Sequence, residues 1–196
     1  MKRAIALGTF DGVHIGHRAI INAAIDKAAE LDMEPMIYTF TAHPMALFGK
    51  QPPLLMTQSE RMAALGGMGC TLSADEFSAE YAATEPEQFI KMLIERFNMG
   101  CAVAGFNYTF GRRGEGSVEL IKKLGEKYGF AVEIVPPVMY KGEAVSSTRI
   151  RACLEAGRVK DAGEMLGAPY SITGPVIRNR GIGRTLDYPT ANIAGW

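Results

Sequence analysis

The chain has 196 residues, and its 21 lysines and arginines balance its 21 aspartates and glutamates, so the formal net charge is zero. A balanced charge argues against general binding to nucleic acid or to anionic lipid, because both require a basic excess. Hydrophobic residues make up 47% of the chain, which argues against disorder and indicates a globular core. No apolar run is long enough for a membrane helix or a signal peptide, so we expect a cytoplasmic protein with no membrane partner.

The first half of the chain alternates between strand and helix patterns. A short apolar run over residues 2–7 predicts a strand, and apolar residues at helical spacing predict a helix over 17–31. The stretch 41–53 is rich in proline and small residues, which indicates a long functional loop. The other elements of this half are predicted at 36–40 (strand), 58–65 (helix) and 68–73 (weak strand).

The second half continues the alternation and begins with a helix-capping pattern. Thr84 and Glu87 have the spacing of a capping box, and the apolar face of a helix follows them as far as Phe97. Strands that alternate with helices pair in parallel, because parallel neighbours need a long crossover. We therefore predict an α/β domain with a parallel sheet flanked by helices over residues 1–167. Its remaining elements are predicted at 101–104 (strand), 117–128 (helix), 131–135 (strand), 146–157 (helix) and a short helix ending at 166–167.

The pattern changes after Gly167, and the cysteines carry no metal pattern. Val176 and Ile177 indicate a strand of a different, β-type unit over residues 168–196. The three cysteines are far apart and lie in apolar or helical patterns, unlike the closely spaced pairs that bind metal. We expect buried free thiols, and the sequence assigns no metal ligand.

The segment His14-Ile15-Gly16-His17 is the strongest chemical signal, because it lies directly after the first strand and at the start of a helix. A helix N-terminus offers unpaired amides and a partial positive charge, and Gly16 lets a ligand approach the backbone. This combination suits a polyphosphate. The alternative is that one histidine caps the helix while the other is simply exposed.

A second anion site is predicted at residues 146–151, Ser-Ser-Thr-Arg-Ile-Arg, where extended chain again turns into helix. The hydroxyls of Ser147 and Thr148 can bind phosphate oxygens, and Arg151 can add a bidentate charged contact. The alternative is a helix cap followed by a solvated basic face. Together with the histidines, the segment indicates a nucleotide held between two helix N-termini at the carboxyl edge of the sheet.

Five motifs, in this order, resemble those of bacterial bifunctional riboflavin kinase/FMN adenylyltransferases, also called FAD synthetases: GTFDGVHIGH, YTFTAHP, GFNYTFG, VSSTRIR and GRTLDYPTANI. The resemblance covers essentially the whole chain. It implies a Rossmann-like nucleotidylyltransferase domain over residues 1–167, followed over 168–196 by the start of a riboflavin kinase-type β-barrel.

The resemblance implies transfer of AMP from ATP to the phosphate of FMN, which gives FAD and pyrophosphate, with Mg²⁺. The FMN phosphate is already a competent nucleophile, so the enzyme has to align two anions and offset their repulsion. In this reading His14, His17 and Arg151 are catalytic. The residues implied in ATP binding are Gly8, Thr9, Phe10, Asp11, Gly16, Ser147 and Thr148.

The flavin end is predicted from aromatic residues after the strand 101–104. Tyr108 and Phe110 alternate with polar residues, and aromatic faces beside the amide of Asn107 suit a flat ring with polar edges. Some of these aromatics could instead belong to a half-buried strand. The resemblance also places the long loop with His43 and Pro44 near the substrates.

The kinase-type segment carries Thr190 and Asn192, which in the family lie near the metal and the ATP phosphates of the kinase domain. It departs from the family pattern by having Asp187 and Tyr188 in place of Gly and Phe. Residues 168–196 are too few to close a barrel, so we expect no phosphorylation of riboflavin.

Two other functions remain open at this point. The same phosphate-binding motifs could serve an adenylyl or cytidylyl transferase with another acceptor, or a weakly active flavin- or nucleotide-binding module. A class I aminoacyl-tRNA synthetase, which also carries HIGH, is disfavoured because the chain has no KMSKS-like segment. We expect only small-molecule partners, the substrates ATP and FMN.

Overall fold

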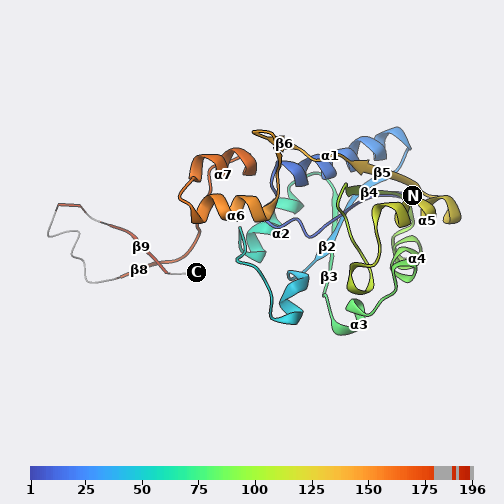
Figure 1. Ribbon diagram of the computed structural model, residues 1–196, viewed down its shortest axis with the longest axis horizontal. Helices are drawn as coiled ribbons and strands as arrows, with labels where there is room; N and C mark the ends of the chain where they lie inside the picture. Colours follow the sequence, from blue (N-terminus) through green and yellow to red (C-terminus); the bar gives the residue numbers. More distant parts are fainter. Residues whose placement is uncertain (179–186, 189, 195–196) are drawn as a thin grey trace.

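The centre of the protein is a parallel sheet. The computed structural model describes residues 1–178, 187–188 and 190–194. The sheet has five strands in the order β3-β2-β1-β4-β5, and all four neighbouring pairs are parallel (Figure 1). The direction of winding reverses between β1 and β4, which is where open α/β sheets bind their ligands. The strands are β1 (Arg3–Leu7), β2 (Glu34–Phe40), β3 (Thr71–Asp75), β4 (Met99–Gly105) and β5 (Ala131–Val135).

Helices cover both faces of this sheet, as the prediction of an α/β domain required (Figure 1). Between the main helices lie a short helix α3 (Ala79–Ala82), two 3₁₀ turns, η1 (Pro44–Phe48) and η2 (Arg112–Gly114), and the hairpin of β6 (Met139–Tyr140) and β7 (Glu143–Ala144). The main helices are α1 (Ile15–Glu30), α2 (Gln58–Gly66), α4 (Pro86–Phe97), α5 (Val118–Tyr128), α6 (Ser147–Glu155) and α7 (Val159–Leu166).

Alternate side chains of β1 build the two halves of the core. Ile5 and Leu7 pack with residues of α4 and α5, whereas Ala4 and Ala6 pack with residues of α1 and α2. A strand that is buried on both faces needs an unbroken apolar run, which explains the sequence of β1.

Two local predictions need correction. The helix predicted to start from a Thr84–Glu87 capping box is capped one residue later, where the Gln88 side chain accepts the backbone N–H of Glu85 at 3.4 Å. Pro86 then takes the first helical position, where its missing N–H costs nothing. All three cysteines are free, as predicted, but Cys70 is only partly buried while the other two are buried.

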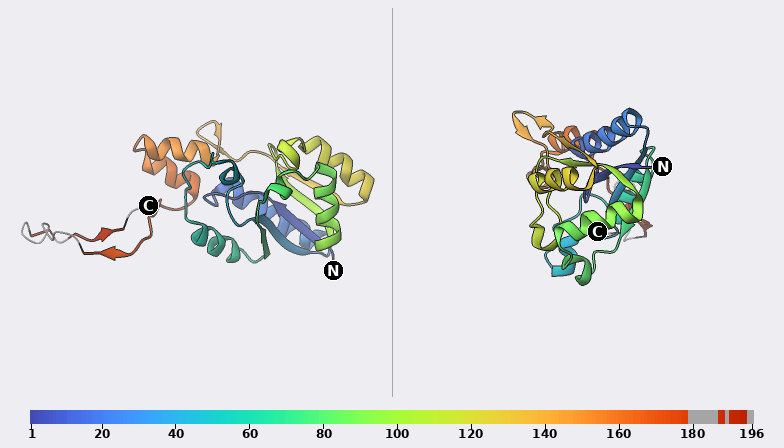
Figure 2. Two further views of the ribbon diagram at one scale, coloured as in Figure 1. Left: turned by 90° about the horizontal axis from the view of Figure 1, so that it is seen from below. Right: turned by 90° about the vertical axis from the view of Figure 1, so that its right-hand side faces the viewer.

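The C-terminal part of the described chain has a small core of its own. Residues of α6 and α7 pack with Leu55 and Val145. Beyond α7, the strands β8 (Val176–Ile177) and β9 (Asn192–Ile193) form an antiparallel pair that extends away from the α/β body (Figure 2). Within the described residues, no helix combines the length and the apolar character needed to cross a membrane.

Candidate active site

Two cavities adjoin at the carboxyl ends of β1 and β4, where the winding of the sheet reverses. The larger has a volume of about 710 Å³ and the smaller about 350 Å³. They share four lining residues: Gly8, Thr9, Tyr108 and Thr109. Groups bound in the two cavities would therefore meet at these residues.

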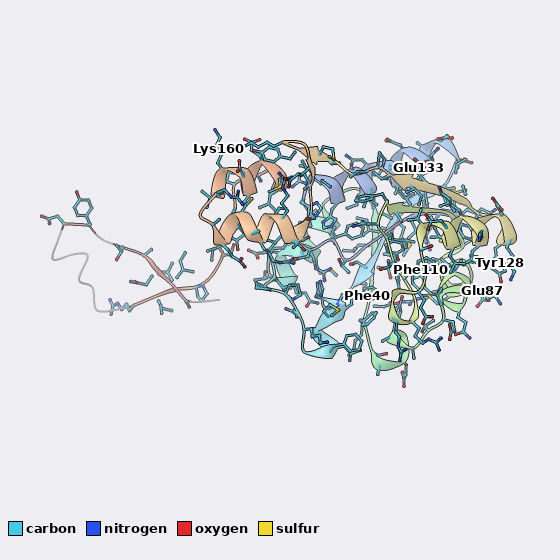
Figure 3. All side chains as sticks on the ribbon, viewed as in Figure 1. Phe40, Glu87, Phe110, Tyr128, Glu133 and Lys160 are labelled. Carbon is cyan, nitrogen blue, oxygen red and sulfur yellow. The ribbon has the colours of Figure 1, made fainter. Side chains whose placement is uncertain are left out.

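Eight aromatic side chains line the larger cavity. Phe40 comes from the end of β2 and Phe110 from the loop after β4, and both lie at this end of the sheet (Figure 3). The ring of Phe40 meets that of Tyr81 edge-on at 5.1 Å, and the rings of Tyr108 and Phe110 stack at 5.7 Å. Such walls suit a flat aromatic ligand. The rest of the aromatic wall is formed by Tyr38, Phe48, Phe77 and Phe89.

A polar network fixes one side of this aromatic wall. The hydroxyl of Tyr38 donates to Asp75 Oδ2 at 2.7 Å and lies 2.7 Å from the hydroxyl of Tyr81. Arg96 pairs with the same carboxylate through Nη1 and Nη2, at 2.5 and 2.9 Å. Burial raises the pKa of both tyrosines above the usual value, so they stay neutral. The wall is therefore rigid, and its tyrosines carry no charge.

The smaller cavity lies between the start of α1 and the start of α6. His14, Gly16 and His17 line one side, and Ser147 and Thr148 line the other. Both helix ends direct unpaired backbone amides toward this region, and both carry the positive end of a helix dipole. The sequence prediction of two helix N-termini on one cavity is therefore realised.

The two histidines are stacked and have different tasks. His14 caps α1, because its Nδ1 accepts the backbone N–H of His17 at 3.2 Å. The two rings lie nearly parallel, with centroids 3.5 Å apart. Nδ1 of His17 is buried and has no hydrogen-bond partner in the part of the chain that the structure describes. The sequence also allowed that one histidine caps the helix while the other is simply exposed. Only the first part of that alternative holds, because His14 caps the helix but both histidines line the cavity.

Both imidazoles are held in the neutral form. Burial lowers the pKa of His14 to about 4. Burial, and then the charges of His14 and Arg61, lower the pKa of His17 well below its usual value. A neutral His14 whose Nδ1 accepts a hydrogen bond must carry its proton on Nε2. His14 can therefore donate a hydrogen bond from Nε2 while it caps the helix.

Two hydroxyls at the start of α6 already form hydrogen bonds within the protein. Ser146 caps the helix by accepting the N–H of Arg149 at 3.2 Å, and Ser147 Oγ donates to the carbonyl of Asp11 at 2.9 Å. The Thr148 hydroxyl has no hydrogen-bond partner among the described residues, and Thr148 lines the smaller cavity. Of the two hydroxyls predicted to bind phosphate at the start of α6, that of Thr148 is therefore the one free for a phosphate oxygen.

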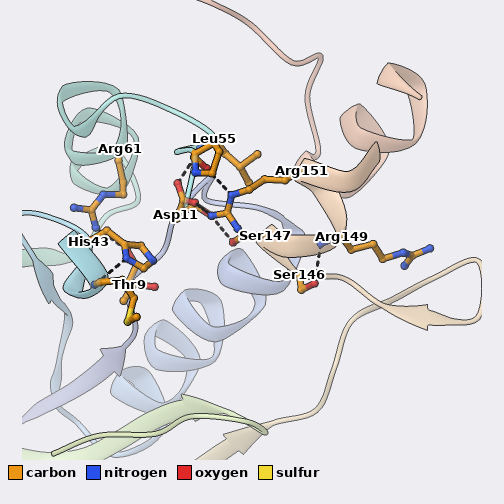
Figure 4. A network of polar contacts seen from close by, with 11 residues as sticks. Thr9, Asp11, His43, Leu55, Arg61, Ser146, Ser147, Arg149 and Arg151 are labelled. Atoms are coloured by element: carbon orange, nitrogen blue, oxygen red, sulfur yellow. Dashed lines mark hydrogen bonds and ion pairs between the residues drawn. The ribbon is translucent and has the colours of Figure 1, made fainter. Parts of the chain in front are cut away.

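Arg151 does not line either cavity. Its Nη2 pairs with Asp11 Oδ2, and its Nε donates to the carbonyl of Pro53 at 2.5 Å (Figure 4). The Asp11 carboxylate is almost completely buried, and its other oxygen accepts the N–H of Leu55 at 3.2 Å. Asp11 lines a small pocket beside Thr9 and His43 instead, and the predicted contacts of both residues with the nucleotide stay predictions.

The other predicted residues divide between the two cavities. Asn107, predicted for the flavin, lines the smaller cavity, together with Phe10. His43 and Pro44 line the larger one, and His43 caps η1 by accepting the N–H of Met45 at 3.2 Å.

The kinase-type residues lie apart from this site. Asn192 lies on β9 and Thr190 shortly before it, and neither lines either cavity. The prediction that they belong to a second, kinase-type site is therefore independent of the two cavities.

Arg61 is a site residue that sequence reasoning missed. It lies on α2 and is only 6% exposed. Its guanidinium donates to the carbonyls of Thr9 and Phe40, both at 2.6 Å, and to that of Thr41 at 3.2 Å. Burial lowers its pKa, while the charge of Asp11 opposes that shift. The sequence signal that could have found it is an arginine one turn before the apolar Leu65, on the same face of the predicted helix.

The parallel sheet, its reversal point and the stacked histidines at the first helix define an α/β protein of the nucleotidyltransferase type. The FAD synthetase family model matches residues 1–149, and the chain belongs to that family. A riboflavin kinase model matches residues 166–195. The predicted family and the α/β fold class of the first domain are thereby confirmed, and the start of a β-barrel after it stays a prediction.

Curated relatives and a solved structure agree with this assignment. The bifunctional riboflavin kinase/FMN adenylyltransferases of Bacillus subtilis and Listeria monocytogenes are 36% and 31% identical over 98% of this chain. The chain spans 62% of the length of these relatives. A crystal structure described as a macrolide-efflux protein from Streptococcus pneumoniae matches with a TM-score of 0.88 and 33% identity, over 98% of this chain and 64% of that one.

Proposed function

We propose that this chain transfers AMP from ATP to the phosphate of FMN, giving FAD and pyrophosphate. The observation that carries the proposal is the pair of cavities that share Gly8, Thr9, Tyr108 and Thr109. The aromatic cavity suits the isoalloxazine ring, and the cavity between two helix N-termini suits a triphosphate. A reaction between two phosphates requires such a meeting point.

The transfer needs alignment more than it needs a protein nucleophile. An oxygen of the FMN phosphate attacks the α-phosphorus of ATP, a new P–O bond forms, and the bond to the β-phosphate oxygen breaks to release pyrophosphate. Nε2–H of His14 and the amides at the starts of α1 and α6 stabilise the charge on the transferring phosphoryl group and on pyrophosphate. His17 and Thr148 add hydrogen bonds from the two sides of the smaller cavity.

Magnesium enters this proposal as part of the substrate MgATP. No group of three or more His, Cys, Asp or Glu side chains that could hold a metal ion occurs among the described residues. Mg²⁺ commonly binds through substrate phosphates and water with few protein ligands, which is consistent with such a site. Asp11, three residues before His14, is already paired with Arg151.

The boundary near residue 167 belongs to the same proposal. Helix α7 ends at Leu166, and Gly167 terminates it with a positive φ of 75°. The riboflavin kinase match begins at residue 166, and the β8–β9 pair follows. We infer that residues 168–196 belong to a kinase-type unit and contribute nothing to the adenylyl-transfer site.

The test is to incubate the purified chain with FMN, ATP and Mg²⁺ and to separate FAD and pyrophosphate by chromatography. We expect FAD from FMN, no FMN from riboflavin in a parallel reaction, and loss of FAD formation in His17→Ala. Near-normal transfer by that variant would show that the histidine assignment is wrong. Tight ATP binding without any FAD would instead favour another acceptor or a binding module.

A further inference from the structure

We propose that four polar side chains, here called the tyrosine network, position one wall of the larger cavity and thereby set the affinity for the acceptor. The network runs from Tyr81 through Tyr38 and Asp75 to Arg96. The wall is the segment 76–84, which joins β3 to α4 and includes α3. The inference rests on the proposed function, in which the larger cavity holds the ring of FMN.

The segment 76–84 depends on the network for its place. Its helix α3 has only four residues, and Ser78 caps it from within the segment by accepting the N–H of Tyr81 at 3.1 Å. Among the described residues, the hydroxyl of Tyr81 is the one side-chain group of the segment that forms a hydrogen bond with the rest of the protein. The far end is held by the carbonyl of Thr84, which accepts the N–H of Arg112 at 2.6 Å. The residues of the segment that line the larger cavity are Phe77, Ala79, Tyr81, Ala82, Ala83 and Thr84.

The hydrogen bonds of the network have a fixed direction. Burial raises the pKa of both tyrosines, so each hydroxyl keeps its single hydrogen. Tyr38 donates its hydrogen to Asp75 Oδ2 at 2.7 Å, which leaves its oxygen to accept the hydrogen of Tyr81, 2.7 Å away. Arg96 binds both oxygens of the same carboxylate, at 2.5 and 2.9 Å. Because hydrogen bonds to charged groups are the stronger ones, the ion pair fixes Tyr38, and Tyr38 in turn fixes Tyr81.

The ring of Tyr81 transmits this position to the aromatic wall. Its centroid lies 5.1 Å from that of Phe40, 5.5 Å from that of Phe77 and 6.1 Å from that of Phe89. All four residues line the larger cavity, and none of them lines the smaller one. A displaced Tyr81 would therefore change the shape of the acceptor cavity and leave the phosphate cavity as it is.

The test is a double-mutant cycle with Tyr38→Phe, Tyr81→Phe and the double variant, all of which keep the aromatic rings. We expect each single variant to raise the KM for FMN about three- to tenfold, which is the range expected for a lost hydrogen bond. The KM for ATP and kcat should change less than about twofold, because the smaller cavity is not altered. The double variant should be no worse than Tyr38→Phe, since in that variant Tyr81 has already lost its acceptor.

The matched control is Tyr140→Phe, which removes a tyrosine hydroxyl elsewhere in the protein. Tyr140 donates to Asp161 Oδ1 at 3.0 Å and lines neither cavity, so this variant should retain wild-type kcat and both KM values. The proposal is overturned if Tyr38→Phe leaves the KM for FMN within about twofold of wild type. Additive effects of the two tyrosine variants would also overturn it, since the hydroxyls would then act independently.

Two measurements without turnover separate this inference from the proposed function. Amide hydrogen exchange in the segment 76–84 should be about three- to tenfold faster in Tyr38→Phe than in wild type, and unchanged in α1 and α6. The affinity for FMN, measured by quenching of flavin fluorescence, should fall by the same factor as the KM rises. If the wild type binds FMN but makes no FAD, the proposed function fails and the inference is still tested by these two measurements. Equal exchange in the two proteins would refute the anchoring of the segment, and a wild type that binds no FMN would refute its role in acceptor binding.

Discussion

The two cavities differ in how the chain builds them. The smaller one includes two short segments, residues 14–17 and 146–148, each at the first turn of a helix, beside the ends of β1, β4 and β5 and the loops that follow them. The aromatic one collects side chains from β2, η1, α3, α4 and the loop after β4. In the proposed reaction, phosphate binding depends on backbone amides that any such turn supplies, whereas ring recognition depends on tertiary packing. The comparison predicts that changes in the smaller cavity affect the transfer step, and changes in the larger one affect the acceptor.

The largest effect is expected for His14, because it both caps α1 and carries a donor on Nε2. His14→Ala should lower kcat about 10²- to 10³-fold, as the loss of one preorganised donor does in other sites. His14→Asn separates the two tasks, since asparagine caps helices well but cannot reach the position of Nε2. We expect His14→Asn to keep wild-type stability and still lose the activity, as measured by FAD formation and urea unfolding. Activity within about threefold of wild type in His14→Asn would contradict a donor role for Nε2.

The next effect concerns the residue that supports both cavities, Arg61. Arg61→Met should destabilise the protein by about 3 kcal/mol, because it leaves the buried carbonyls of Thr9 and Phe40 without their donor. Arg112→Met is the matched control, since Arg112 forms exposed ion pairs with Glu85 and Glu115. That control should lie within about 0.5 kcal/mol of wild type in urea unfolding. An equal loss of unfolding free energy in both variants would show that the buried hydrogen bonds of Arg61 do not stabilise the protein more than an exposed ion pair does.

The third effect is a pH dependence of stability that arises in the smaller cavity. The pKa of His14 is about 4 in the folded protein and near 6.5 when unfolded, so between these values the unfolded chain binds more protons. The free energy of unfolding is therefore highest above about pH 6.5 and falls as the pH is lowered, by about 2 kcal/mol between pH 7 and pH 5 from His14 alone. Urea unfolding at several pH values measures this slope. In the same series, the His14→Asn variant should lose the part of the pH dependence that His14 causes. An unchanged pH dependence would show that it does not arise from His14.

Most of the fold could be predicted because its signals are local. The strands β1, β2 and β4 are buried on both faces, so their apolar runs are continuous and easy to recognise. β3 is half-buried at the edge of the sheet, and its pattern is correspondingly weak: the strand was predicted over 68–73 and lies at Thr71–Asp75. The capping of α4 was misplaced by one residue because Pro86 determines where that helix can begin.

The site could be predicted only where its residues are neighbours in the chain. His14 and His17 lie three residues apart, so their common place at one helix start is visible in the sequence. The partner of Arg151 lies 140 residues away, and the carbonyls that Arg61 binds lie 20 to 52 residues away. Such contacts are fixed by the packing of α2 against β3 and of α6 against α7 and Leu55, which a pattern along the chain does not encode.

The smallest expected effect tests the comparison most directly, by removing one aromatic ring from each cavity. Phe40 lines the larger cavity, and Phe106 lines the smaller one and is 47% exposed. Phe40→Ala should raise the KM for FMN about tenfold with little change in the KM for ATP, because a lost aromatic contact costs about 1.4 kcal/mol. Phe106→Ala should leave the KM for FMN unchanged. Steady-state kinetics with each substrate varied in turn measures both, and an equal effect of the two variants on FMN would mean that ring recognition is shared between the cavities.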